Sequence, residues 1–229
     1  KIDWCDCTVN PVIGCPNGCE YCYARRQNKR FHYVKDWDKP EYKPEVLKQL
    51  KCKKPKSVFI DSMSDIGCWQ QEWFYVVTRA IRDNPQHRYI ALTKRYDGFI
   101  KLSESAHIGS CSSVRANVTP IKTLFVGVRV TTQAQAEKYT TAFPDFPDFF
   151  SIEPILEPIK LVDYAMPKTL IIGAETGNRK GKVIPQKEWI DSLVKQADEH
   201  NCIVFMKESL CKIMGDDFRQ DSLPWRVSK

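Results

Sequence analysis

Histidine is scarce in this chain, and long apolar runs are absent. The four histidines, His32, His87, His107 and His200, stand singly in the sequence. A structural zinc site closes with four ligands, commonly a cysteine pair answered by a distant pair that contains histidine, and no such second pair follows here. No segment approaches the roughly 18 consecutive apolar residues that a membrane span needs, so we expect no membrane association.

The chain also lacks sequence repeats, low-complexity segments and a recognisable domain linker. Its opening residues show no basic-then-apolar signal pattern, and its ten cysteines are spread over 229 residues. Secreted disulfide scaffolds are shorter and denser in cysteine. We therefore expect a cytoplasmic protein with reduced thiols, folded as a single domain over residues 1–229.

Positive charge is present in excess. The formal net charge is +7, and part of it comes from two clusters, Arg25–Arg30 and Lys51–Lys56. Such clusters can attract a polyanion, nucleic acid included. Each cluster taken alone is explained at least as well as part of a solvated helix face or loop.

Three cysteines lie close together near the start of the chain. Cys15, Cys19 and Cys22 have the spacing C-x3-C-x2-C. Thiolates are soft ligands that hold iron in sulfide clusters, and three of them in one loop can hold three corners of a four-iron cube while the fourth iron stays open. A dithiol redox reading would use Cys19 and Cys22 only; a zinc or disulfide loop is the other alternative.

Short apolar runs alternate with amphipathic stretches along the chain, which is typical of a parallel α/β fold. Six runs predict strands: Ser57–Asp61, Arg88–Thr93, Leu124–Val128, Asp148–Ile152, Thr169–Gly173 and Cys202–Met206. The segment Thr8–Ile13 is a candidate for a seventh strand. Helices are predicted over Cys22–Arg30, Pro44–Lys51, Gln70–Asn84, Gln133–Phe143 and Pro185–His200.

Polar residues follow each apolar run. They form six clusters, namely Ser62–Asp65, Lys94–Arg95, Arg129–Gln133, Glu153–Pro154, Glu175–Gly177 and Lys207–Glu208. In a parallel barrel the carboxyl ends of the strands meet at one mouth, where catalytic groups lie. Any one of these residues can be an ordinary ion pair or helix cap, but buried charge at all six ends indicates a polar ligand.

The cysteine spacing, with Tyr21 before the last cysteine, resembles the cluster signature of the radical S-adenosylmethionine (SAM) enzymes. Further segments resemble the uncharacterised phage-associated family of radical-SAM-like proteins, often encoded beside a three-Cys-motif partner protein. They are Cys22–Arg25, Leu92–Arg95, Ser151–Pro154, Gly173–Gly177 and Phe205–Lys207. This resemblance runs from Lys1 to Trp225. It implies a partial (β/α)6 TIM-like barrel of parallel strands, with a cluster loop at 14–23 and a C-terminal extension over about residues 208–229.

The same resemblance implies an enzyme in which Cys15, Cys19 and Cys22 bind a [4Fe-4S] cluster. An external electron donor then drives reductive cleavage of SAM to a 5′-deoxyadenosyl radical. The implied cofactor-binding residues are Ser62, Ser64, Asp65, Arg129, Thr131, Gln133, Gly173, Glu175 and Gly177. The residues implied to line the substrate side are Lys94, Arg95, Glu153 and Lys207, whose mixed charges favour a polar substrate.

Two other classes of function stay open at this stage. One is a nucleic-acid-binding protein that grips a strand through phosphate contacts and aromatic stacking. The other is a redox-sensing or binding module whose iron-sulfur or zinc site is only structural. A structural site would need a fourth cysteine, and Cys5, Cys7 and Cys68 are the candidates.

Overall fold

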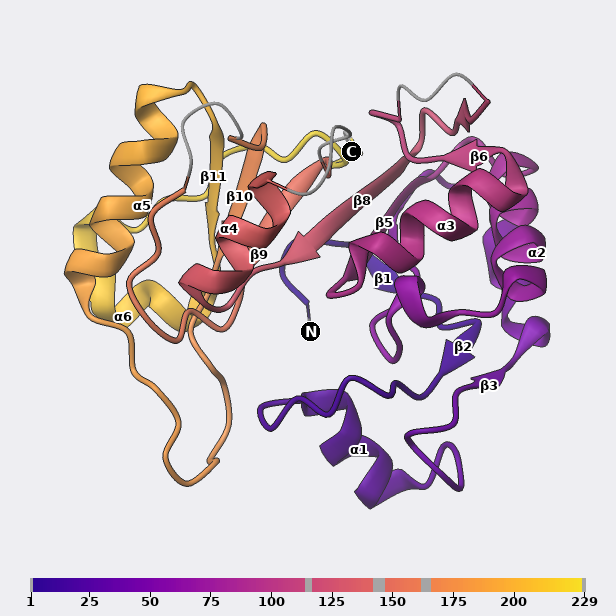
Figure 1. The fold of residues 1–229 in the computed structure, drawn as a ribbon, viewed down its shortest axis with the longest axis horizontal. Coiled ribbons are helices and arrows are strands. Elements are labelled where there is room, and N and C mark those ends of the chain that lie inside the picture. The colour runs from indigo at the N-terminus through magenta and orange to yellow at the C-terminus, as the bar shows by residue number, and fades with distance from the viewer. Residues whose placement is uncertain (1, 114–116, 142–146, 162–165, 228–229) are drawn as a thin grey trace. The chain divides into compact units, whose positions relative to one another are not determined.

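A computed structural model describes residues 2–113, 117–141, 147–161 and 166–227 of the chain (Figure 1). The chain is an α/β protein with parallel strands. It divides into two compact units, each described here by itself. Unit 1 comprises Lys1–Val126 with Trp225–Lys229, and unit 2 comprises Gly127–Pro224.

The strands of unit 1 alternate with helices along the chain. Its main strands, in their hydrogen-bonded order, are β1 (Cys7–Thr8), β4 (Ser57–Phe59), β5 (Arg88–Thr93) and the first half of β8 (Leu124–Arg129). The pairs β1–β4 and β4–β5 are parallel. Two short pairs accompany them, β2 (Val12–Ile13) with β3 (Glu41–Tyr42) and β6 (Ile108–Gly109) with β7 (Thr119–Pro120).

The helical segments of unit 1 are α1 (Tyr23–Phe31), η1 (Pro44–Lys51), η2 (Ile66–Cys68), α2 (Gln71–Arg82) and α3 (Tyr96–Ala106). Helix α2 buries Phe74, Val77, Thr78 and Ile81. These positions have the i, i+3, i+4, i+7 spacing of one helix face, so the face that enters the core is set by the sequence. Helices α2 and α3 pack against each other, with the rings of Phe74 and Phe99 6.1 Å apart (Figure 1).

Unit 2 continues the same alternation. Its strands are the second half of β8, then β9 (Phe149–Ile152), β10 (Thr169–Ile172) and β11 (Ile203–Met206), all parallel and in that order. The helical segments are α4 (Gln133–Thr141), α5 (Lys187–Glu199), η4 (Glu208–Leu210), α6 (Cys211–Met214) and η5 (Gly215–Asp217). Strands β9 and β10 are fully buried, and each is accordingly apolar except for one hydroxyl residue, Ser151 or Thr169.

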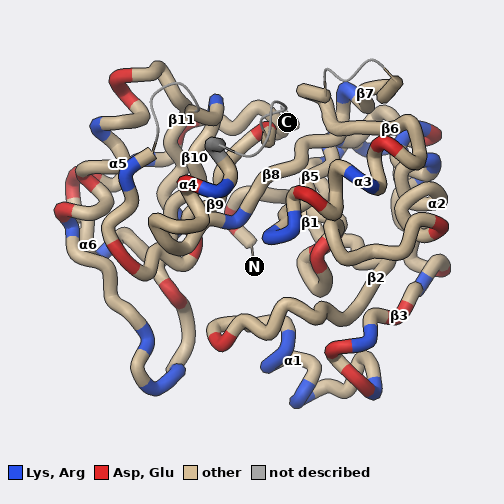
Figure 2. The backbone as a smooth tube through the Cα atoms, in the orientation of Figure 1, with Lys and Arg blue, Asp and Glu red and all other residues tan. Residues whose placement is uncertain are grey.

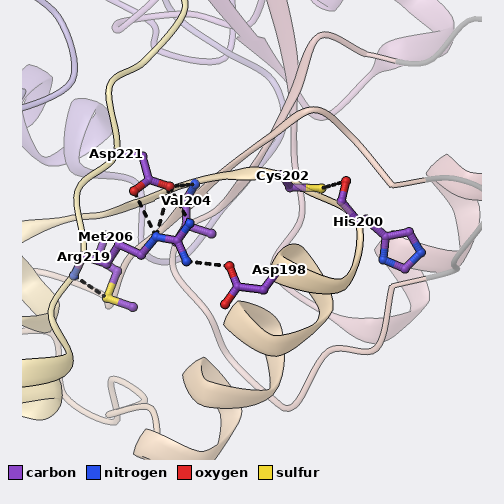
Figure 3. A network of polar contacts seen from close by, with 7 residues as sticks. All are labelled: Asp198, His200, Cys202, Val204, Met206, Arg219 and Asp221. Atoms are coloured by element: carbon purple, nitrogen blue, oxygen red, sulfur yellow. Dashed lines mark hydrogen bonds and ion pairs between the residues drawn. The ribbon is translucent and has the colours of Figure 1, made fainter.

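An ion-pair network fastens the C-terminal segment of unit 2 to β11 and α5 (Figure 3). The Arg219 guanidinium donates to Asp221 at 2.7–3.0 Å and to Asp198 at 2.6 Å. The Asp221 carboxylate also accepts from the backbone N–H of Val204 at 2.9 Å. Asp221 therefore accepts hydrogen bonds from two sources, the Arg219 side chain and the backbone of strand β11.

The structure confirms the six strands predicted from apolar runs, each within two residues at either end. The seventh candidate, Thr8–Ile13, is divided between β1 and β2, and only β1 joins the main strands. The predicted helix Pro44–Lys51 is a 3-10 helix. Helix α3 was not expected from the sequence. None of the described helices combines the length and the apolar character required to cross a membrane.

Candidate functional site: the cysteine loop of unit 1

The cysteine loop, residues 14–23, runs from β2 to the first turn of α1. Its start is pinned to the rest of unit 1, because Gly14 N–H donates to Met63 O at 3.0 Å and Cys15 N–H donates to Trp37 O at 2.8 Å. Gly14 has φ = +112°, and a Cβ there would lie 2.9 Å from backbone atoms of Trp37 and Pro40. Only glycine allows this close approach.

Two of the three thiols lie against an apolar cluster. Cys15 and Cys22 pack on buried Ala24, Val34, Trp37 and Met63. The Cys22 sulfur also accepts the Arg25 N–H at 3.4 Å, so Cys22 caps helix α1. Burial raises the pKa of Cys22. A hydrogen bond with the Cys68 thiol, reinforced by burial, raises the pKa of Cys15.

Asn17 connects the cysteine loop to the elements around it. Its side-chain Nδ2 donates to Asp65 Oδ2 at 2.6 Å, and its Oδ1 accepts from Arg95 Nε at 2.8 Å. The Cys68 thiol donates to the same Oδ1 at 3.7 Å, and the Cys19 thiol donates to the Asn17 carbonyl at 3.9 Å. One asparagine therefore orients two sulfurs and two charged side chains.

The Asp65 carboxylate joins the segments that follow β4 and β5. It is 5% exposed and accepts from Gly67 N–H at 3.0 Å, Thr93 Oγ1 at 2.5 Å and Lys94 N–H at 2.9 Å, besides Asn17. A buried carboxylate with four donors is well satisfied. Asp65 therefore holds the cysteine loop at the carboxyl ends of two parallel strands.

A second contact ties the loop to the end of β5. The Lys94 ammonium contacts the Tyr21 hydroxyl and lies 4.6 Å from the centroid of the Tyr21 ring. This is the geometry of a cation–π interaction. Tyr21, the aromatic residue before the last cysteine, thereby places the predicted substrate-side residue Lys94 beside the loop.

Cys68 supplies a fourth sulfur next to Cys15. It ends η2, which packs closely on the start of α3. A Cβ on Gly67 would lie 2.2 Å from Arg95 O, and a Cβ on Gly98 would lie 2.1 Å from Gly67 O. Two glycines thus permit the contact that sets the position of Cys68.

The predicted cofactor-binding residues Ser62 and Ser64 lie in the segment after β4. The Ser62 hydroxyl donates to Asn10 Oδ1 at 3.0 Å, and the Ser64 hydroxyl accepts from Trp69 Nε1 at 3.0 Å. Together with Asp65 they share the carboxyl end of β4 with the cysteine loop. Each is engaged by protein groups in this conformation.

The other predicted site residues belong to unit 2. Glu153 follows β9 and Lys207 follows β11, and the two side chains form an ion pair in which each is less than one-fifth exposed. Gly173 lies between them at the end of β10, where a Cβ would be 3.0 Å from Lys207 Cδ and 3.2 Å from Glu153 Cγ. The strand ends of unit 2 therefore carry a largely buried ion pair, and both of its side chains pack against Gly173.

Glu175, one of the predicted cofactor-binding residues, pairs with a cation of its own segment. Its carboxylate, 2% exposed, accepts two bonds from the Arg179 guanidinium at 2.7 and 2.8 Å. Arg179 is four residues further along the same segment, so this pairing is local. Gly177, between them, has φ = +87°, which glycine adopts without strain.

The segment after β8 is held by its own side chains. Arg129, half-buried, is the last residue of β8. The Gln135 side-chain oxygen accepts from the backbone N–H and the hydroxyl of Thr131 at 2.7 and 3.0 Å. The Gln133 side chain exchanges hydrogen bonds with backbone groups of Lys160 at 2.7 and 3.1 Å. Thr131 and Gln133 therefore stabilise the start of α4.

Within the described ranges, no group of three or more His, Cys, Asp and Glu side chains is arranged to hold a metal ion. The donor set itself suits iron, since three cysteines share one loop and two of them lie on an apolar surface. Because a metal binds thiolates, loading this loop would displace the protons that the raised pKa values retain.

Sequence reasoning overlooked two residues that organise the loop, Asn17 and Tyr21 as a partner of Lys94, whereas Cys68 was one of the three candidates for a fourth cysteine. Asn17 lies inside the cysteine motif, but its partners are 48 and 78 positions away. These distant partners could have been predicted only from the expectation that the carboxyl ends of the strands lie close together.

A comparison with known proteins gives one family. A family model described as "Protein of unknown function (DUF5131)" matches residues 1–214. No curated protein and no solved structure matches the chain. The radical SAM resemblance stays a prediction. Because the matched region covers most of its 229 residues, the chain belongs to the DUF5131 family.

Proposed function

We propose that this protein is a radical SAM enzyme of the cytoplasm, folded as a partial (β/α)6 barrel. In this proposal Cys15, Cys19 and Cys22 hold a [4Fe-4S] cluster. The observation that carries it is the docking of the cysteine loop at the carboxyl ends of β4 and β5 through Asn17 and Asp65. Active sites of parallel α/β barrels lie at that end of the strands.

The chemistry of the donor set supports the choice of group. Cys15, Cys19 and Cys22 would hold three irons of a four-iron cluster and would leave the fourth without a protein ligand, free for SAM. When bound, a cluster of this kind supplies the electron that splits SAM into methionine and a 5′-deoxyadenosyl radical. An external electron donor is required.

The chain's own residues position and screen this chemistry. Asp65 and Asn17 fix the loop, and the apolar cluster under Cys15 and Cys22 excludes water from one side of the sulfurs. Ser62 and Ser64 offer hydroxyls at the same strand end for the SAM ammonium group. Tyr21 holds Lys94 beside the loop.

We assign the substrate side to Lys94, Arg95, Glu153 and Lys207. The Glu153–Lys207 pair offers both signs of charge in a half-buried place, which suits a polar substrate. Arg129, Thr131, Gln133, Gly173, Glu175 and Gly177 remain the proposed contacts to the rest of SAM. A three-Cys-motif protein is the proposed protein partner.

The test is SAM binding and cleavage by anaerobically reconstituted protein. Isothermal titration should give binding to the cluster-loaded form and none to the metal-free form. Reduction with dithionite should then release 5′-deoxyadenosine slowly, as measured by chromatography against a Cys19→Ala control. A loaded and reduced protein that neither binds nor cleaves SAM would overturn the proposal.

A second candidate, a structural or redox-sensing metal site, is favoured by one observation. The Cys68 side chain is the largest cause of the raised pKa of Cys15 and its thiol donates to Asn17 Oδ1, so a fourth sulfur lies beside the loop. Cys68→Ser separates the two functions. The enzyme proposal expects unchanged iron content and SAM binding in this variant, whereas a four-thiolate structural site would lose metal.

A further inference from the structure

The segment that follows the cysteine loop is strongly basic. Between Cys22 and Lys35 there are four Lys and Arg residues and no carboxylate. Within α1 all charged residues are cations, and Figure 2 shows the helix with blue segments only. Arg26, Lys29 and Arg30 are exposed, and their i, i+3, i+4 spacing places them on one face.

Two carboxylates that follow helix α1 are paired with cations outside this face. Asp38 pairs with Arg25, and Asp36 lies 3.5 Å from Lys39. Because α1 itself contains cations and no carboxylate, the face formed by Arg26, Lys29 and Arg30 carries a positive charge density that attracts a polyanion.

Two aromatic rings lie beside these cations. Phe31 and Tyr33 are 53% and 44% exposed, although large apolar side chains are usually buried. Their ring centroids are 5.7 Å apart, and the Arg30 guanidinium lies 5.0 Å from the centroid of the Phe31 ring. Exposed rings among cations form the platform on which unpaired bases stack.

Asn28 fixes the turn that carries Phe31 and Tyr33. This residue is 7% exposed, and its side chain exchanges hydrogen bonds with the backbone of Val34 at 3.0 and 3.1 Å. His32 ends the helix with φ = +54° and donates its N–H to Asn28 O at 2.8 Å. The turn that carries the rings is thus fixed before any ligand arrives, which lowers the entropic cost of binding.

We propose that this surface, formed by Arg26, Lys29, Arg30, Phe31 and Tyr33, binds single-stranded nucleic acid. The cations contact phosphates, and the two rings stack on bases. Paired bases do not offer their faces, so single strands are favoured over duplex. Helix α1 begins one residue after Cys22, and a strand bound here lies next to the cysteine loop. The inference does not depend on what that loop holds.

Fluorescence anisotropy with labelled 20-nucleotide oligo-dT, oligo-rU and a 20-base-pair duplex, over a series of NaCl concentrations, tests the proposal. The protein should bind single strands more tightly than duplex, with and without metal in the loop. Arg26→Gln/Lys29→Gln/Arg30→Gln should reduce the slope of log K against log salt by about 2, since each phosphate contact contributes about 0.7. Phe31→Ala/Tyr33→Ala should weaken binding about fivefold or more at fixed salt and keep the slope.

The matched control carries the same changes on another exposed face of unit 1. Arg79→Gln/Arg82→Gln/Lys101→Gln removes three exposed cations from α2 and α3, and Tyr75→Ala removes a ring that is 49% exposed. These variants should bind as the wild type does, and Arg26→Lys/Arg30→Lys should keep the salt slope. Circular dichroism verifies folding. The proposal is overturned by absence of binding, by equal affinity for duplex or for phosphatidylserine vesicles, or by equal losses in the control.

Discussion

Asn17 donates its side-chain amide to the Asp65 carboxylate at 2.6 Å, joining two residues that are 48 positions apart in the sequence. The same carboxylate accepts from the Thr93 hydroxyl and the Lys94 N–H. A single acid therefore fastens the cysteine loop to the segments after β4 and β5. Asp65 therefore couples the position of the cysteine loop to the positions of the segments that follow the two strands.

This coupling predicts that Asp65→Asn loosens the loop. The substitution turns one acceptor oxygen into a donor that faces other donors, so at least one charge-assisted hydrogen bond, worth about 1.5–3 kcal/mol, is lost. The free energy of unfolding of the metal-free protein, measured in urea, should fall by about that amount or more. The exposed Asp83→Asn change at the end of α2 is the control and should stay within about 0.5 kcal/mol of wild type. Equal stability of both variants would contradict this role.

Glu175 and Glu153 should differ in their effect on SAM. Glu175→Gln leaves the Arg179 guanidinium without its buried counter-charge and should displace the Gly173–Gly177 backbone, so SAM affinity by titration should fall. Glu153→Gln should retain SAM affinity and impair turnover, because Lys207 then lacks its partner on the substrate side. Circular dichroism should show both variants folded. The reverse order of SAM affinities would show that these roles are misassigned.

The C-terminal network predicts an acid-dependent loss of stability. Hydrogen bonds from Arg219 hold the pKa of Asp221 below its ordinary value. A carboxyl with a depressed folded pKa stabilises the protein above its unfolded pKa of about 3.9, and this stabilisation disappears as the pH falls through the folded pKa. Urea unfolding from pH 6 to pH 2.5 should show wild type and Asp221→Asn converging at low pH. A constant difference between them would refute the assignment.

The main strands could be predicted from the sequence, because buried parallel strands are continuous apolar runs such as Leu170–Ile172. Helix α3 was missed because Gly98 and two serines weaken its helical pattern, even though its buried residues Tyr96, Phe99 and Ile100 have helical spacing. Gly98 is present for packing, since a Cβ would lie 2.1 Å from Gly67 O. Local propensity cannot register such a contact.

The proposed cluster ligands of the candidate site could be predicted from the sequence, but the residues that hold the cysteine loop in place could not. The spacing of Cys15, Cys19 and Cys22 is local and can be read directly. The hydrogen bonds of Asn17 and the Lys94–Tyr21 contact join residues 48 to 78 positions apart, and they exist only once the strands are aligned. Glu175 pairs with Arg179 because a partner four residues away costs less chain ordering than a distant one.

Iron content after anaerobic reconstitution tests the central claim most directly. Wild type and Cys202→Ala should each hold about four irons per chain with a charge-transfer band, because Cys202 lies in unit 2 and donates to the His200 carbonyl at 3.8 Å. Cys19→Ala should lose the band and the iron. A Cys19→Ala protein that retains a full cluster would contradict the assignment of the loop.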